Sequence, residues 1–191
     1  MDVANEVVAQ EGDRFKHMKE QQAISEIGHL GMSKMLSSAS IVLDTIRAGF
    51  DVWFREQSLY DQGEYEEAMG ILERHGYLQN QDGAVWFTSS NLGDNRDNVL
   101  VRSNGAPTYF ASDVAYHYNK FFTRGFDWVV NVWGADHQGH VNRMRAAVQA
   151  LGVDPNRMEL IVYQMVTFKR GSELVRASKR SGNVISISEL V

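Results

Sequence analysis

The chain has 191 residues, 43% of them hydrophobic and 23% charged, which is enough for one large domain or two small ones. These proportions exclude a wholly disordered or collagen-like protein. No apolar run reaches the roughly 20 residues that a membrane helix needs, and no secretory pattern opens the chain, so we expect a cytoplasmic protein without a membrane partner. The lack of Cys excludes disulfides and thiolate metal sites. A net charge of −5 argues against a general nucleic-acid-binding surface, and we expect no DNA partner.

The first two thirds of the chain alternate between helical and β patterns. Helix is expected in one or two pieces over 13–48, stopped by Gly49, and again over Glu64–His75, closed by Gly76. Short strands are expected at Phe50–Phe54, Ala84–Thr88 and Val99–Arg102. A further helix is expected to start near Ser112 as its N-cap and to end at Gly125.

The last third predicts a parallel β-α-β unit. Trp128–Trp133 and Leu160–Val166 are apolar runs with little alternation, as expected for strands covered on both faces. Between them, apolar residues at helical spacing mark a helix that stops at Gly152. Strand, helix and strand of these lengths form a parallel pair with a right-handed crossover. We therefore expect an α/β fold.

Polar segments follow both of these strands and indicate a nucleotide site. Residues 134–140 (GADHQGH) follow the first strand, and a cationic stretch that ends in residues 178–183 (SKRSGN) follows the second. Ligands of open parallel sheets bind beyond the carboxyl ends of the strands, so both segments should lie at one edge. A carboxylate suits a ribose, and a Gly/Ser-rich basic loop suits phosphates. A solvated basic hairpin is the alternative interpretation of the cationic stretch.

Four ordered motifs carry a resemblance to a known family. They are residues 51–58 (DVWFREQS), 109–117 (YFASDVAYH), 133–137 (WGADH) and 176–183 (RASKRSGN). In this order they resemble arginyl-tRNA synthetase, a class I aminoacyl-tRNA synthetase, over nearly the whole chain. The resemblance implies the second half of a Rossmann-like nucleotide fold in residues 106–191, including a "KMSKS"-like loop at 176–183. It also implies a helical and mixed α/β insertion region in residues 1–105.

The resemblance implies an arginine site with four residues. A guanidinium is a planar cation with five donors, so its pocket needs carboxylates and an aromatic face. The residues implied for this role are Glu56, Tyr109, Asp113 and His137. Tyr109 and Asp113 are four apart, a spacing that can aim both side chains into one cavity. The alternative is that Asp113 complements a helix dipole and Tyr109 belongs to the core.

The resemblance further implies an ATP site and a mobile lysine. Gly134 and Asp136 resemble the segment beside the adenosine ribose, and Met165 and Val166 are expected near the adenine edge unless they are plain core. Lys179 is the expected catalytic residue, because a lysine that meets charge on the departing pyrophosphate stabilises the transition state. Ser178 and Arg176 accompany it, whereas Ala177 replaces the family's usual Met. ATP, with Mg²⁺, L-arginine and tRNA-Arg are the implied substrates.

Two departures from the family pattern lead us to expect a fragment. Ile27-Gly28-His29 lies inside a helical stretch, so we do not take it as the family's "HIGH" motif, and no helical anticodon-binding domain follows residue 191. We therefore expect a central slice of such an enzyme, weakly active or inactive by itself.

Two other functions are compatible with the residues. A non-catalytic remnant that binds arginine or a nucleotide would use the same pocket. A metallohydrolase could draw on two histidines and a carboxylate from the set Asp113, His117, Asp136, His137 and His140. The second function leaves the 178–183 loop without a role.

Overall fold

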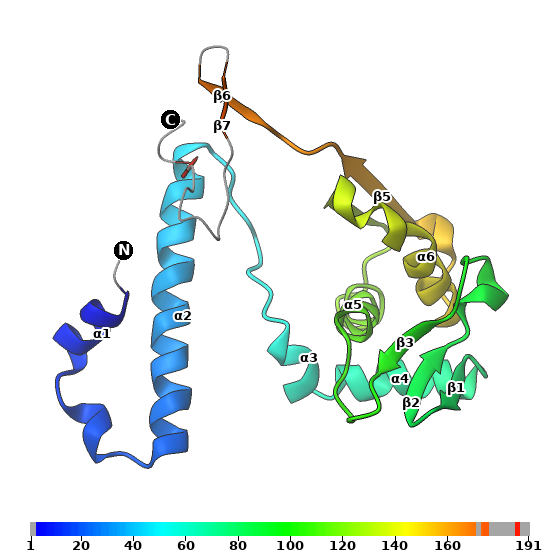
Figure 1. Cartoon of the computed structure of the whole chain (residues 1–191), viewed down its shortest axis with the longest axis horizontal. Helices are drawn as coiled ribbons and strands as arrows, with labels where there is room; N and C mark the ends of the chain where they lie inside the picture. The colour runs from blue at the N-terminus through cyan, green and yellow to red at the C-terminus, as the bar shows by residue number, and fades with distance from the viewer. Residues whose placement is uncertain (1–2, 171–172, 176–185, 188–191) are drawn as a thin grey trace. The chain divides into compact units, whose positions relative to one another are not determined.

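The computed structural model of the chain describes residues 3–170, 173–175, 186 and 187. The fold is α/β, and the chain forms two compact units: residues 1–53 with 168–191, and residues 54–167 (Figure 1). We call them unit 1 and unit 2. The expected division at residues 105 and 106 falls inside unit 2, where strand β3 and helix α5 on either side of it pack together.

Unit 1 is built around one long helix. Its elements are α1 (Val3–Glu11), the 3-10 turn η1 (Arg14–His17), α2 (Glu20–Thr45) and the antiparallel pair β6 (Phe168–Arg170) and β7 (Glu173–Val175). Within 13–48 the structure therefore has a short turn and a single helix of 26 residues, while α1 was not predicted. The helix ends before Gly49, because Arg47 already has a φ of +57°. No residue of α2 is buried.

Unit 2 contains the core cluster of the described chain. Its elements are α3 (Gln57–Asp61), α4 (Glu64–Arg74), β1 (Leu78–Gln81), β2 (Ala84–Phe87), η2 (Ser89–Leu92), β3 (Asn98–Val101), α5 (Tyr109–Tyr118), the π-helical turn η3 (Asn119–Thr123), β4 (Val129–Gly134), η4 (Ala135–His140), α6 (Val141–Ala150), η5 (Pro155–Arg157) and β5 (Met158–Tyr163). The largest fully buried side chains are Leu59, Leu72, Phe87, Leu100, Val114, Met144, Val148 and Met158. They come from both sheets and from α3 to α6, so these elements share one interior.

Unit 2 holds two separate sheets. Strands β1, β2 and β3 form an antiparallel sheet, in which β2 and β3 match the two predicted strands and β1 was missed. Strands β4 and β5 pair in parallel, from Val129 with Met158 to Gly134 with Tyr163. Helix α6 lies between these two strands in sequence and ends before Gly152, whose φ is +89°. The predicted β-α-β unit is confirmed.

The structure corrects three local predictions. Residues 50–54 form no strand; the Phe54 ring instead stacks on Tyr116, with centroids 4.2 Å apart. Helix α5 begins at Tyr109, because Thr108 is the N-cap and its Oγ1 accepts a hydrogen bond from the Ala111 amide. Strands β4 and β5 are buried on one face only, with alternating exposed residues such as Val132.

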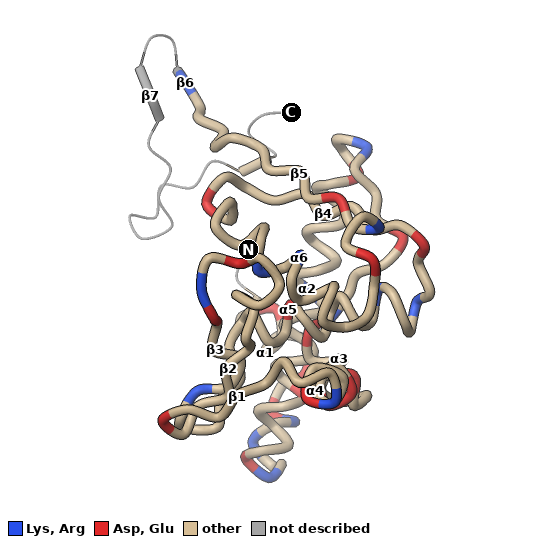
Figure 2. The backbone as a smooth tube through the Cα atoms, turned by 90° about the vertical axis from the view of Figure 1, so that its right-hand side faces the viewer, with Lys and Arg blue, Asp and Glu red and all other residues tan. Residues whose placement is uncertain are grey.

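Polar contacts join the helices of unit 2. The His75 ring donates from Nδ1 to the carbonyl oxygen of Ala150, 2.7 Å away, which ties α4 to the carboxyl end of α6. Buried Glu64 at the start of α4 accepts hydrogen bonds from Asn119 and Thr123 of η3. Figure 2 shows acidic positions on α4, whose first turn carries Glu64, Glu66 and Glu67, where the helix dipole favours negative charge. No helix among the described residues is both long and apolar enough to cross a membrane.

Candidate functional site

A cavity of about 180 Å³ opens between α3 and α5 in unit 2. We call it the α5 pocket, and it is lined by Phe54, Glu56, Leu59, Ser112, Asp113 and Tyr116. Two carboxylates and two aromatic rings therefore share one small cavity. This combination suits a flat cation, which needs charged acceptors at its rim and π faces beside it.

Local structure explains why these side chains meet. Glu56 is the residue before the first turn of α3, and its carbonyl oxygen accepts a hydrogen bond from the Leu59 amide. Asp113 and Tyr116 are three apart on α5, so both project from one side of the helix. Ser112 is buried and shares a 2.7 Å hydrogen bond with the Tyr60 hydroxyl of α3. The α3–α5 contact thus fixes the width of the pocket.

The electrostatic environment of Asp113 is mixed. Partial desolvation is the main cause that raises the pKa of its carboxyl, and the negative charge of Glu56 raises it further. The positive charges of Arg143, Lys120 and, when protonated, His137 act in the opposite direction. Two neighbouring carboxylates that repel each other gain most from a cation that binds between them.

A chain of hydrogen bonds runs behind Asp113. His117 is buried, and its Nδ1 lies 2.7 Å from the carbonyl oxygen of Asp113, which can only accept. The proton is therefore on Nδ1, and Nε2 accepts from the Asn131 amide at 3.1 Å. The Asn131 oxygen in turn accepts from Lys120 Nζ at 2.7 Å. We call Lys120, Asn131 and His117 the relay.

Burial controls the titration of the relay. Desolvation, followed by the charge of Lys120, lowers the pKa of His117 to about 4, so the ring is neutral at pH 7. Desolvation also lowers the pKa of Lys120 to about 8, although the charge of Asp113 opposes the change. The Lys120 ammonium lies 4.2 Å from the centroid of the Tyr116 ring.

Tyr109 and His137, the other two residues expected at the arginine site, do not line the α5 pocket. Tyr109 is 84% exposed at the first position of α5, so it is not a core residue. His137 lies on η4, half exposed, with its Nε2 3.7 Å from an oxygen of Asp136. It lies close enough to influence the charge of Asp113.

The residues expected at the ATP site gather at the carboxyl edge of the parallel sheet. Gly134 ends β4 opposite Tyr163 of β5, and Asp136 and the segment 164–167 follow these strand ends. A Cβ on Gly134 would lie 2.7 Å from Asp136 Oδ1, so glycine allows the carboxylate to fold back over the strand end. Met165 and Val166 are each 68% exposed, so they are not core residues. The role of these four residues in ATP binding stays a prediction.

The expected catalytic residues Arg176, Ser178 and Lys179 lie outside the described residues.

A metal centre finds no support in the described part of the chain. There, no three His, Cys, Asp or Glu side chains are grouped to hold an ion. His117, one of the residues considered, already uses both ring nitrogens in hydrogen bonds. Its lone pair is therefore not available to a metal beside Asp113.

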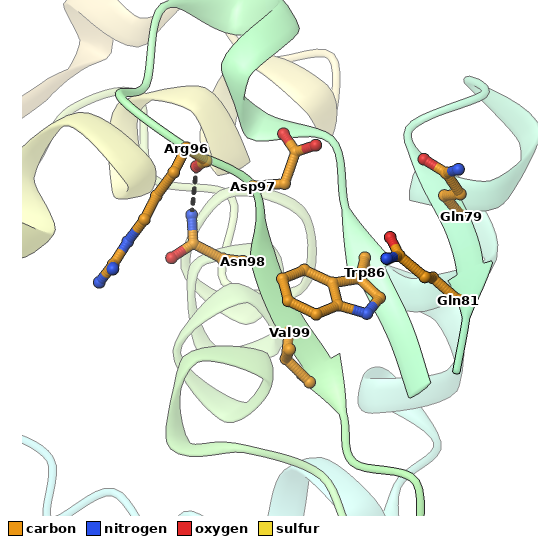
Figure 3. A pocket seen from close by; sticks show the side chains of 7 residues that line it. All are labelled: Gln79, Gln81, Trp86, Arg96, Asp97, Asn98 and Val99. Carbon is orange, nitrogen blue, oxygen red and sulfur yellow. Dashed lines mark hydrogen bonds between the residues drawn. The ribbon is translucent and has the colours of Figure 1, made fainter. Parts of the chain in front are cut away.

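A larger cavity, of about 510 Å³, lies on the antiparallel sheet (Figure 3). It is lined by Gln79, Gln81, Trp86, Arg96, Asp97, Asn98 and Val99. The Asn98 amide turns toward the backbone and donates to the Arg96 carbonyl oxygen at 3.0 Å, as the dashed line shows. None of the described residues expected at the arginine or ATP sites lines this cavity.

Comparison with known proteins decides the family. The model of the catalytic domain of class I tRNA synthetases for arginine matches residues 4–191. The chain belongs to the class I arginyl-tRNA synthetase family. It is 52% identical over its full length to an arginine–tRNA ligase of Dehalococcoides mccartyi and 49% identical to one of Carboxydothermus hydrogenoformans. In both comparisons it spans 34% of the relative, about a third of the length.

Solved structures of arginyl-tRNA synthetases share the fold. A crystal structure described as an arginyl-tRNA synthetase from Campylobacter jejuni matches 99% of this chain and 40% of its own, with a TM-score of 0.84 and 33% identity. The Thermus thermophilus arginyl-tRNA synthetase matches 93% of this chain and 37% of its own, with a TM-score of 0.67. At 19% identity the second match supports the fold alone.

Sequence reasoning missed several residues around the α5 pocket. Phe54 was assigned to a strand, and Tyr116 and Lys120 were not singled out. Helical spacing was the available signal, because Asp113, Tyr116 and Lys120 are separated by three and four residues. Asn131 could not be found in this way, since only the tertiary structure brings β4 to α5.

Proposed function

We propose that this chain contributes the arginine pocket of an enzyme that activates L-arginine with ATP and transfers it to tRNA-Arg. The observation that carries the proposal is the α5 pocket, where Glu56 and Asp113 face a shared cavity beside Phe54 and Tyr116. Family membership supports the reaction, and the pocket supports the choice of amino acid.

In this proposal the guanidinium binds between the two carboxylates. Asp113 and Glu56 accept its hydrogen bonds, which are charge-assisted and geometrically selective. The stacked Phe54 and Tyr116 rings form the apolar wall along the arginine stem. His137 lies toward the parallel sheet, on the segment that follows β4, and is assigned to the same substrate. Tyr109, at the exposed start of α5, is assigned to the rim.

ATP and Mg²⁺ enter as one substrate at the edge where β4 and β5 end. Gly134 and Asp136 are assigned to the ribose, and the backbone of Met165 and Val166 is assigned to the adenine edge. The arginine carboxylate attacks the α-phosphate and pyrophosphate leaves. Lys179, with Arg176 and Ser178, is assigned to the charge that develops on this leaving group.

Calorimetry with L-arginine and L-citrulline tests the pocket. Citrulline has almost the same shape but a neutral urea group, so we expect arginine to bind at least tenfold more tightly. Asp113→Asn removes one charge-assisted hydrogen bond, worth about 1.5–3 kcal/mol, and is expected to weaken arginine binding by tenfold or more.

Glu67→Gln is the matched control, since it removes a carboxylate from an exposed position of α4. It should leave arginine binding unchanged. Equal binding of arginine and citrulline, or an Asp113→Asn variant that binds arginine like the wild type, would contradict the assignment.

A further inference from the structure

Lys120 is a partly buried cation without a carboxylate partner close by. Its Nζ donates to the Asn131 amide oxygen and lies over the Tyr116 ring, and among the described residues it forms no ion pair within 4 Å. A neutral amide oxygen and an aromatic ring compensate only partly for the water that this ammonium group has lost. Lys120 can therefore lose its proton when a further positive charge comes near.

Tyr116 separates Lys120 from the α5 pocket. Phe54 stacks on one face of the Tyr116 ring, with centroids 4.2 Å apart and planes within 19°. The Lys120 ammonium, also 4.2 Å from the centroid, must therefore lie over the opposite face. Phe54 and Tyr116 both line the pocket, so the Tyr116 ring that contacts Lys120 is also part of the pocket wall.

The charged groups around Lys120 leave Asp113 as its main counter-charge. From α5 it faces Asp113, Tyr116 and the neutral ring of His117, and from β4 it faces Asn131. Arg124, just after η3, adds a second positive charge. The charges of Glu56, Arg143 and His137 act on Asp113 as well.

We propose that Lys120 is a positioning residue of the α5 pocket that holds Asp113 and the Tyr116 wall in the empty site and gives up its proton when a guanidinium binds. The inference rests on the proposed function, because it assumes that arginine is the cation. In the empty pocket the charges of Arg143 and Lys120 both favour the ionised form of Asp113, and Arg143 has the larger effect. A guanidinium bound at this carboxylate adds a further positive charge, which disfavours the ammonium form of Lys120.

The proton leaves as Lys120–NH₃⁺ becomes Lys120–NH₂ and the buffer accepts H⁺. The neutral amine keeps a hydrogen for the Asn131 oxygen, so the relay and the His117 tautomer persist. Reciprocity then requires that arginine binds more tightly once Lys120 is neutral. If deprotonation of Lys120 raises the affinity for arginine about tenfold, about 0.4 proton should be released per bound arginine at pH 8.

Calorimetry of the full chain with L-arginine, in buffers of different ionisation enthalpy at pH 8, measures the released protons. Lys120→Met is neutral and Lys120→Arg stays charged at every pH used. Neither variant should therefore release the proton that Lys120 releases when arginine binds. The α-amino group of arginine contributes equally in all three proteins, and the difference from wild type isolates Lys120.

Both variants should differ from the wild type in the pH dependence of arginine affinity between pH 7.5 and 9.5, a range in which imidazoles are neutral. With the same coupling of about tenfold, wild-type affinity should rise about threefold over this range, whereas Lys120→Arg should stay at the low-pH level and Lys120→Met should also lack the rise. Arg145→Met, which removes an exposed charge from α6, should behave like wild type.

The protonation of Lys120 can also be measured directly in the wild type. This test does not require that the Lys120 variants fold. The ¹³Cε resonance of Lys120 should titrate with a midpoint near 8 and move to lower pH when arginine saturates the pocket. Arginine binding without buffer dependence or a shifted midpoint would overturn the role of Lys120 and leave the arginine pocket intact. Absence of arginine binding would overturn the proposed function itself.

Discussion

Acidification is expected to destabilise the protein through His117. The ring is neutral, buried among Asp113, Asn131 and Tyr116, and its pKa falls from 6.5 to about 4 on folding. The unfolded chain therefore binds this proton more readily than the folded one, so the free energy of unfolding decreases as pH falls from 6.5 toward 4.

The two pKa values give the magnitude. Between pH 7.5 and 5.0, His117 alone should reduce the free energy of unfolding by about 2 kcal/mol. The full reduction, reached when the pH is below both pKa values, is about 3.4 kcal/mol. Carboxylates that titrate over the same range contribute too, so the wild type must be compared with a variant in which they are unchanged. His117→Gln is suitable, because its amide does not titrate and offers one donor and one acceptor.

Urea unfolding followed by Trp fluorescence measures this difference. Trp86, Trp128 and Trp133 lie in unit 2, and Trp133 packs against its core cluster. We expect the variant to be less stable than wild type at pH 7.5, yet to lose about 2 kcal/mol less on going to pH 5.0. Parallel losses in the two proteins would refute the reasoning, and so would an imidazole ¹H titration of His117 with a midpoint near 6.5.

Two further results are expected from unit 2. Glu64→Ala leaves the donors of Asn119 and Thr123 without their acceptor and should cost about 2–3 kcal/mol in urea unfolding, while exposed Glu67→Ala stays within about 0.5 kcal/mol. A fragment of residues 54–167 contains the α5 pocket and the core cluster, so it should unfold cooperatively and bind L-arginine as tightly as the full chain; a fragment without a urea transition would contradict the division into units.

Much of the fold could be predicted because its signals are local. Apolar spacing and the stop at Gly152 identify α6, and two apolar runs on either side identify the parallel pair. Strand β1 was missed because its residues, Leu78–Gln81, are mostly polar and it pairs only on one side. The start of α5 was misplaced because Ser112 and Thr108 are both good caps, and only packing against Tyr60 decides that Ser112 lies inside the helix.

The candidate site could be predicted only in part. The pairing of Glu56 with Asp113 in one cavity follows from the motif resemblance, and the structure brings both side chains to the α5 pocket. The relay could not be predicted, because it depends on a π-helical turn that contains Lys120 and on how β4 packs against α5, which brings Asn131 to both partners. Contacts of this kind arise from tertiary structure and leave no periodic signal.

The parallel pair β4 and β5 has a practical consequence for work with the purified chain. Neither strand has a second neighbour among the described residues, and Val130, Val132 and Ile161 face solvent. Free backbone donors and acceptors beside bare aliphatic side chains promote edge-to-edge association between molecules. Light scattering across a dilution series should therefore precede any titration, and a solubilising partner fused to the chain will widen the concentration range in which binding can be measured.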